Sequence, residues 1–269
     1  MKFLRQLRNK WVVARSLGGG MVLTSANAVL LCTLALVGRL RFRGMRVPVV
    51  HTTEAGRHCF WVGSGSDETV LNEVFVRQEY AVPVSPPPRT IVDVGGNVGY
   101  AALFFAARFP DATVHTIEPD PENYARLERN TKRVARIRPA NCALGDTRGS
   151  LRFFRSVHSG MSSSLVPRPG AIATEVTGTT LDDFLAERGI ATVDLLKFDV
   201  EGAELRLFRG SRSLSAIRAI VGEVHEDLQG VSLEEFLALL PDFSIEVRKT
   251  KPQRYVVFGI NRSAIDARG

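Results

Sequence analysis

The chain has 269 residues, of which 45% are hydrophobic and 23% charged; these proportions are typical of a globular protein and exclude a disordered or fibrous one. The net charge of +7 comes from the first 46 residues, which hold nine basic side chains and no acidic one and leave 26 basic and 28 acidic residues in the rest. Because the larger part of the chain is slightly acidic, nucleic acid is not expected as a partner.

The N-terminal segment contains an uncharged run, residues 16–38, that is long enough to cross a bilayer as a helix. Glycines at 18–20 weaken a continuous helix there. We favour a helix that packs on the main domain, and the alternative is peripheral membrane contact through the basic residues of segment 1–46. The chain has three widely spaced cysteines: Cys32, Cys59 and Cys142. They predict reduced thiols and a cytoplasmic location. Association with a membrane is expected only if the basic segment 1–46 contacts one.

A stiff break divides the chain, because Ser85 is followed by three prolines. Residues 1–88 are expected to form an N-terminal extension, in which 47–84 is a small β-rich part with a strand at 60–62 followed by a short helix. Residues 89–269 are expected to form the catalytic domain.

Within this domain, short apolar runs alternate with helical patterns, which predicts a mostly parallel sheet that binds its ligand at the carboxyl ends of the strands. The expected strands are residues 91–94, 112–117, 137–144, 193–198 and 217–224, an extra strand at 151–155, and an antiparallel pair at 244–247 and 254–260. The expected helices are residues 98–109, 121–134, 203–208 and 232–240, and one that begins after Thr180.

A glycine turn joins the first of these strands to its helix, in the order Asp-x-Gly-x-x-x-Gly from Asp93 to Gly99. Glu118 ends the next strand, where an acid can accept the hydroxyls of a ribose. The spacing differs from the Gly-x-Gly-x-x-Gly turn of dinucleotide-binding proteins, and Asp93 would repel a pyrophosphate but suit the cationic S-adenosylmethionine. Asn97 tolerates the positive φ that such a turn requires. The alternatives are a turn without a ligand and an NAD(P)-dependent oxidoreductase.

Two longer motifs are more specific: Thr-Thr-Leu-Asp-Asp at 179–183 and Asp-Leu-Leu-Lys-Phe-Asp-Val-Glu-Gly-Ala-Glu at 194–204. With shorter pieces at 92–95, 143–146 and 223–225, they resemble the FkbM family of S-adenosylmethionine-dependent methyltransferases. The resemblance implies an α/β class I methyltransferase fold: a Rossmann-like, seven-stranded, mostly parallel sheet with an antiparallel C-terminal hairpin. It also implies methyl transfer to a hydroxyl of a sugar, glycan or secondary metabolite.

The resemblance further implies a set of cofactor-binding residues. Those at the methionine end are Asp93, Gly95, Asn97 and Gly99. Glu118 would accept both ribose hydroxyls, Ala143 and Leu144 would flank the adenine with Asp146 nearby, and Asp199 would lie at the reacting end.

Four polar side chains follow neighbouring strands and are expected to converge on the methyl acceptor: Asp199, Glu201, Glu223 and His225. His225 or Asp199 is the candidate general base, and Glu201 would position a hydroxyl. A less favoured alternative is a divalent cation on Asp199, Glu223 and His225 that acidifies the hydroxyl. A further alternative is that His225 only orients a neighbouring carboxylate.

Three other features carry weaker expectations. Glu204 is expected to be structural, and Lys197 either pairs with one of the nearby acids or takes part in catalysis. The loop at residues 158–164 is either a cover for the acceptor or an ordinary surface loop. An oxidoreductase is disfavoured further because no Tyr-x-x-x-Lys pair occurs, and a catalytically inactive cofactor-binding module at a membrane surface is the last alternative.

Overall fold

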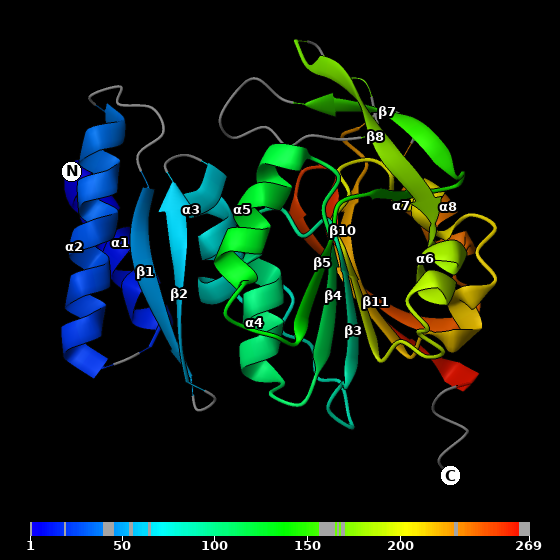
Figure 1. Ribbon diagram of the computed structural model, residues 1–269, viewed down its shortest axis with the longest axis horizontal. Helices are drawn as coiled ribbons and strands as arrows, with labels where there is room; N and C mark the ends of the chain where they lie inside the picture. The colour runs from blue at the N-terminus through cyan, green and yellow to red at the C-terminus, as the bar shows by residue number, and fades with distance from the viewer. Residues whose placement is uncertain are drawn as a thin grey trace.

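The computed structural model describes residues 2–18, 20–39, 46–53, 56–63, 66–155, 165, 167, 170–228 and 231–263 (Figure 1). The loop at 158–164, considered above as a cover for the acceptor, lies outside the described residues. A seven-stranded sheet forms the centre of the molecule, with helices on both of its faces.

The strand order of this sheet is β11-β12-β10-β9-β3-β4-β5. The bounds are β3 Thr90–Val94, β4 Thr113–Ile117, β5 Ile137–Ala140, β9 Leu195–Phe198, β10 Ala219–His225, β11 Phe243–Lys251 and β12 Arg254–Asn261. The first five of these are parallel, whereas β12 runs antiparallel to both β10 and β11. The expected mostly parallel sheet with an antiparallel C-terminal hairpin is confirmed.

Helices cover both faces of the sheet because the central strands are apolar on both sides. All of β9 and β10 is buried. The helices α4 (Tyr100–Arg108) and α5 (Pro121–Thr131) lie on one face, and α6 (Leu181–Glu187), α7 (Glu204–Phe208) and α8 (Leu233–Ala238) lie on the other (Figure 1). The side chains of Asp120 and Thr180 cap α5 and α6 by accepting backbone N–H groups, as the sequence of the Thr180 segment predicts.

The N-terminal part consists of α1 (Lys2–Ser16), α2 (Gly20–Arg39), the antiparallel pair β1 (Arg46–Thr53) and β2 (Gly56–Gly63), α3 (Ser66–Leu71) and the short π-helix η1 (Asn72–Val76). The uncharged run therefore does not form one helix. The Asn27 side chain docks α2 on β1 by bonding both the N–H and the carbonyl of Val50, at 3.0 and 2.9 Å.

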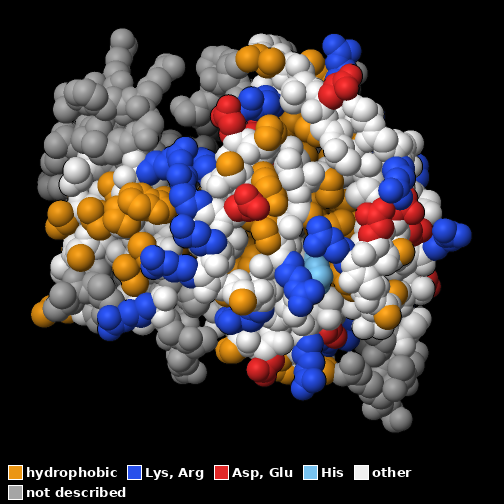
Figure 2. Space-filling view, in the orientation of Figure 1, with side chains coloured by type: hydrophobic (Ala, Val, Ile, Leu, Met, Phe, Trp, Pro, Cys, Tyr) orange, Lys and Arg blue, Asp and Glu red, His pale blue; other side chains and the backbone are white. Residues whose placement is uncertain are grey.

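The outer face of the helical pair remains exposed. Met21 is 80% exposed and Val29 64%, whereas Leu31 is buried, so α2 packs through one face only. Among the described residues, no helix is both long enough and apolar enough to cross a membrane. In Figure 2, hydrophobic side chains gather over β1 and β2, next to Lys and Arg side chains that lie toward α5. Peripheral membrane contact stays a prediction.

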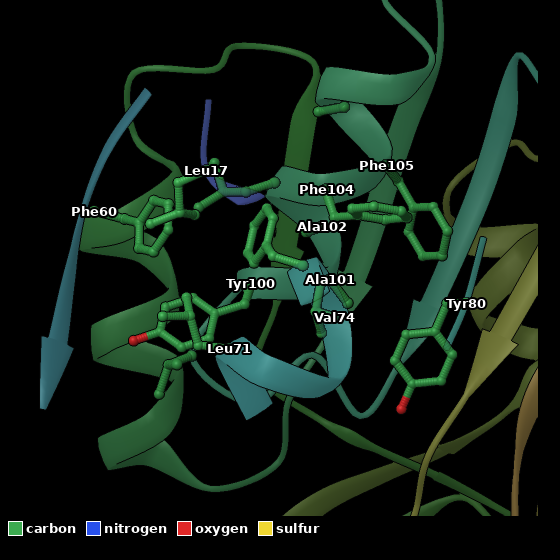
Figure 3. Close-up of a cluster of buried hydrophobic side chains, with 14 of the residues drawn as sticks. Leu17, Phe60, Leu71, Val74, Tyr80, Tyr100, Ala101, Ala102, Phe104 and Phe105 are labelled. Carbon is green, nitrogen blue, oxygen red and sulfur yellow. The ribbon is translucent and has the colours of Figure 1, made fainter. Parts of the chain in front are cut away.

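Side chains on both sides of the proline-rich break share one apolar core (Figure 3). Phe60 of β2 stacks on Phe75 of η1 with ring centroids 5.8 Å apart, and Phe75 contacts the edge of Phe104 of α4 at 5.9 Å. The Tyr100 ring also lies against Phe60, at 5.1 Å. The N-terminal part is thus packed on α4 through buried aromatic rings.

One expected strand was wrong. Residues 137–144 do not form a single strand, because the chain leaves the central sheet after β5 and enters a second, three-stranded sheet as β6 (Ala143–Gly145). That sheet is completed by β7 (Gly149–Arg155) and by β8 (Ile172–Thr180), which the sequence analysis did not predict. Asn141 makes the break, since its side chain donates to the carbonyl oxygens of Glu118 and Pro119.

Asp194 joins three strands at the edge of the sheet where the parallel strands begin. Its Oδ2 accepts the backbone N–H groups of Arg89 and Thr90 at 2.8 and 3.0 Å, and its Oδ1 lies 3.1 Å from the guanidinium of Arg218. Asp194→Ala is expected to lower the free energy of unfolding by about 2 kcal/mol, because several charge-assisted hydrogen bonds are lost. Urea denaturation measures the change. Asp111→Ala, at an exposed residue on the same edge, is the control and should leave the unfolding midpoint unchanged.

Candidate active site

The glycine turn between β3 and α4 adopts a backbone that needs its particular residues. Gly95 has a φ of +81°, and a Cβ atom there would lie 2.0 Å from the carbonyl oxygen of Asp199. Asn97 has a φ of +49° and Gly99 a φ of +92°. The positive φ inferred for Asn97 is therefore present. The turn passes so close to the end of β9 that no side chain fits at Gly95.

A buried ion pair between Lys197 and Asp93 holds the turn in place. The Lys197 ammonium lies 3.0 Å from Asp93 Oδ1 and donates to the carbonyl of Gly95 at 2.8 Å. Asp93 Oδ2 accepts the Thr116 hydroxyl at 2.8 Å. Lys197 is 2% exposed and Asp93 is fully buried. Asp93 thus lies beneath the loop with its partners supplied by the protein, and Lys197 pairs with an acid, one of the two roles considered for it.

Glu118 is fixed at the end of β4 by two backbone donors. Its Oε2 accepts the N–H of Asn97 at 2.8 Å, and its Oε1 accepts that of Asp120 at 3.0 Å. Burial raises the pKa of Glu118 to about 7, although these two hydrogen bonds oppose the shift. The carboxylate is therefore directly joined to the glycine turn and oriented before any ligand arrives.

The residues expected near an adenine ring lie beyond the break after β5. Ala143 and Leu144 are buried in β6, whereas Asp146 follows that strand in an exposed position. Asn141, which the sequence analysis did not single out, ties this segment to the end of β4 through its bond to the Glu118 carbonyl. Asn141 lies outside the motifs that resemble the family, so nothing in the sequence indicated that its side chain would make this bond.

A second group of side chains gathers around His225 at the ends of β9 and β10. Its Nε2 lies 3.2 Å from Glu223 Oε2, 3.6 Å from Glu201 Oε2 and 3.7 Å from Asp199 Oδ1. Glu223 and His225 share one face of β10 because they are two residues apart in a strand. Glu201 reaches the group from a backbone with a φ of +50°, a sparsely populated conformation for a side chain of this kind. The four predicted residues are brought together.

Glu204 accepts a hydrogen bond at the other side of the His225 ring. Glu204 Oε1 lies 2.6 Å from Nδ1 and also accepts the backbone N–H of Gly202 at 3.0 Å. Both Glu204 and His225 are fully buried. Glu204 thus sets the orientation of the imidazole, a more specific task than the structural role expected from the sequence.

Burial and mutual repulsion shift the pKa values of this cluster. Burial raises the pKa of Asp199 to about 7; the positive charge of Lys197 opposes the shift and the negative charge of Glu223 adds to it. Burial alone would lower the pKa of His225, but the hydrogen bond with Glu204 and the nearby carboxylate of Glu223 outweigh that and raise it to about 11. A histidine with this pKa keeps its proton at neutral pH, which argues against His225 as the general base in the state that the structure describes.

Tyr80 connects the two groups and was not predicted. Its hydroxyl donates to Asp199 Oδ2 at 3.0 Å, and its ring lies over the Lys197 ammonium at 5.2 Å. Figure 3 shows the ring at the margin of the apolar cluster, with the hydroxyl pointing away from it. Burial, followed by the charge of Asp199, raises the pKa of Tyr80 well above its ordinary value, so the phenol remains a hydrogen-bond donor.

The buried pair of Lys197 and Asp93 generates a prediction about stability. Lys197→Met leaves the Asp93 carboxylate buried without its cation, and we expect the free energy of unfolding to fall by about 3–5 kcal/mol. The double variant Lys197→Met/Asp93→Asn removes both charges and should regain most of that loss. Urea denaturation of the two variants measures the difference, and equal destabilisation of both would contradict the account.

Comparisons with known proteins agree on one family. The model of the methyltransferase FkbM domain matches residues 93–245. The 31-O-demethyl-FK506 methyltransferase FkbM of Streptomyces tacrolimicus is 32% identical over 216 residues, which cover 66% of this chain and 82% of that protein. The 2-O-methyltransferase NoeI of Sinorhizobium fredii is 29% identical over 192 residues, covering 63% of this chain and 78% of that protein.

Solved structures give a weaker similarity. Aeropyrum pernix fibrillarin in complex with S-adenosyl-L-methionine matches with a TM-score of 0.44 and 14% identity, covering 71% of this chain and 74% of that one. Similarity at this level does not bear on activity. The family assignment rests on the sequence matches, and it removes the oxidoreductase alternative. By the match of its residues 93–245 and by its identity to the Streptomyces enzyme, this chain belongs to the FkbM family of methyltransferases.

Proposed function

We propose that this protein transfers the methyl group of S-adenosylmethionine to a hydroxyl oxygen of a small molecule, such as a sugar, a glycan or a secondary metabolite. The observation that carries the proposal is the position of Asp199, whose backbone packs against the glycine turn while its carboxylate faces the acidic cluster. The names of the relatives, a 31-O-demethyl-FK506 methyltransferase and a 2-O-methyltransferase, support oxygen as the acceptor atom.

The residues around the glycine turn fit this cofactor. The glycines at 95 and 96 let the turn pack directly on the end of β9 and on Thr116, because Cβ atoms there would lie 2.0 and 2.2 Å from the Asp199 carbonyl oxygen and the Thr116 hydroxyl. The carboxylate of Glu118 is oriented to accept the ribose hydroxyls. S-adenosylmethionine supplies a methyl group activated by a positively charged sulfur. The carboxylate of Asp199 next to the turn suits that charge, whereas it would repel a pyrophosphate.

The acceptor is best placed at the two partly exposed members of the cluster. The side chain of Asp199 is 29% exposed and that of Glu201 14%, whereas His225 is fully buried. A hydroxyl could therefore reach the first two but not the imidazole. We assign to the carboxylates the removal of the hydroxyl proton, and to His225 the positioning of those carboxylates. Tyr80 holds Asp199 in place by donating a hydrogen bond to Oδ2.

The affinity for the cofactor should depend on the ionisation of Glu118. Its pKa of about 7 means that the carboxyl is protonated below pH 7 and then accepts ribose hydroxyls less well. The affinity for S-adenosylhomocysteine should accordingly fall as the pH is lowered from 8 to 6. Glu118→Gln should weaken binding about tenfold at pH 8, since a charge-assisted hydrogen bond is lost, and should flatten the pH dependence. Calorimetric titration at several pH values measures both effects.

The same titrations contain the result that would contradict this assignment. If Glu118→Gln bound S-adenosylhomocysteine as tightly as the unaltered protein at every pH, Glu118 would not be part of the pocket. Glu128→Gln, at an exposed carboxylate on the outer face of α5, is the control and should keep both the affinity and its pH dependence.

Methyl transfer itself is tested with a panel of hydroxylated glycans and macrolides incubated with S-adenosylmethionine, and mass spectrometry detects the added methyl group. Asp199→Asn should lower the rate about 10²–10³-fold, because the amide cannot take a proton from the hydroxyl. Its affinity for S-adenosylhomocysteine should stay close to that of the unaltered protein. An Asp199→Asn variant with full activity would remove Asp199 from the reaction, and Asp111→Asn serves as the unaffected control.

A further inference from the structure

Four carboxylates surround the buried imidazole of His225. Glu204 occupies the Nδ1 side of the ring, and three further carboxylates face Nε2 at 3.2–3.7 Å. The two basic side chains near the cluster also bind other carboxylates, Lys197 that of Asp93 and Arg254 that of Asp227, and the charge of Arg254 acts on Glu201 and Glu223 as well. Because like charges this close together in a buried site repel strongly, the arrangement calls for an additional positive charge.

Two buried atoms mark where that charge would lie. His225 Nε2 and Asp199 Oδ1 are both inaccessible to solvent and make no hydrogen bond with any of the described residues. They face each other across 3.7 Å. A buried nitrogen or oxygen without a partner is costly and uncommon in a folded protein. The side chain of His225 is itself fully buried, so this nitrogen, which lies 3.2 Å from Glu223 Oε2, is directed into the cluster and not toward solvent.

The donor atoms have the chemistry and spacing of a cation site. Asp199, Glu201 and His225 each offer one ligand atom, and these atoms all lie within 4.8 Å of one another. Ligand atoms around a divalent cation are about 2.1 Å from it, so opposite ligands are about 4.2 Å apart. Rotations of the carboxylate side chains can close the remaining difference. One imidazole with several carboxylates suits Mn²⁺, Fe²⁺ or Zn²⁺.

Glu204 takes the position of a supporting residue for such a site. A histidine that binds a metal through one nitrogen usually donates its other N–H group to a carboxylate or a carbonyl, which fixes the tautomer and the ring orientation. Glu204 Oε1 accepts from Nδ1 at 2.6 Å and is locked in turn by the backbone N–H of Gly202. The ring is therefore held with Nε2 directed at the cluster, where a bound cation would replace the proton on that nitrogen.

We propose that His225, Asp199 and Glu201 bind a divalent cation, with Glu223 beside them and Glu204 as the carboxylate that orients His225. The role of this cation depends on the proposed function. In methyl transfer, the cation would bind the acceptor hydroxyl and make it more acidic. The O–H bond would then break with the proton passing to a carboxylate of the cluster. The oxygen would form the new bond to the methyl carbon as the bond from that carbon to sulfur breaks, and S-adenosylhomocysteine would leave with the electron pair.

Binding of Mn²⁺ alone tests the site without any acceptor. The full chain is treated with a chelator, dialysed and titrated with MnCl₂, with the bound ion detected by electron paramagnetic resonance. We expect one Mn²⁺ per chain. Asp199→Asn and Glu201→Gln should each weaken its binding at least tenfold, and both are close in shape to the residues they replace. Glu204→Gln should weaken it about tenfold, because a supporting partner of the histidine loses its charge.

His225→Gln removes the central ligand and should abolish binding, but it also leaves buried Glu204 without its partner and can fail to fold. The two carboxylate variants therefore decide the outcome, provided that their circular dichroism spectra match that of the unaltered chain. Glu187→Gln, an exposed carboxylate in an ion pair with Arg148, is the matched control and should bind Mn²⁺ normally. The proposal would be overturned if the folded chain bound no Mn²⁺, or if Asp199→Asn and Glu201→Gln bound Mn²⁺ as tightly as the unaltered chain.

Titration of the same samples with S-adenosylhomocysteine separates this inference from the proposed function. If the cofactor product binds to the unaltered chain and Mn²⁺ does not, the cation site is wrong while the methyltransferase assignment stands. If Mn²⁺ binds and S-adenosylhomocysteine does not, the cation site stands and the cofactor pocket is wrong. Chelator should also abolish methyl transfer in the panel assay, and added Mn²⁺ should restore it.

Discussion

The buried ion pair between Lys197 and Asp93 is the interaction on which the rest of the site depends. It connects adjacent parallel strands, β9 and β3, and the same ammonium group bonds the Gly95 carbonyl of the turn. Removing two charges from water is costly, and the pair is retained where a loop must be held in one position. Thr116 extends the link to β4, where Glu118 is bonded to the other side of the turn. Three neighbouring strands thus hold one short loop rigidly.

A different principle governs the cluster around His225. There the protein gathers like charges around a single imidazole, and three buried atoms, His225 Nε2, Asp199 Oδ1 and Glu204 Oε2, make no hydrogen bond within the described part of the chain. Such an arrangement does not favour folding by itself, because unpaired buried groups are destabilising. It is typical of sites where function determines which residues are present. Stability and chemistry are separated along the strands: the Asp194 bonds secure the edge where the strands begin, and the acidic cluster lies at their carboxyl ends.

Much of the fold and part of the site could be predicted because their causes are local. Apolar strands between helical patterns predicted a mostly parallel sheet, and the carboxyl ends of β9 and β10 brought Asp199 and His225 together as expected for neighbouring parallel strands. The break between β5 and β6 was missed because residues 137–144 are continuous in β-forming character, and only the contacts of the Asn141 side chain reveal it. Tyr80 was missed because its partners are more than a hundred residues away in the chain.

Asp199 unites the two halves of the site in a single residue. Its carbonyl oxygen occupies the space that a side chain at Gly95 would need, so the glycine turn and the end of β9 fit only as a pair. Its carboxylate is held by Tyr80 on one oxygen and directed at His225 on the other. A shift of the glycine turn would therefore move the acidic cluster as well. Because in-line transfer tolerates little error in the distance between donor and acceptor, this coupling gives a physical reason for building both subsites on one strand end.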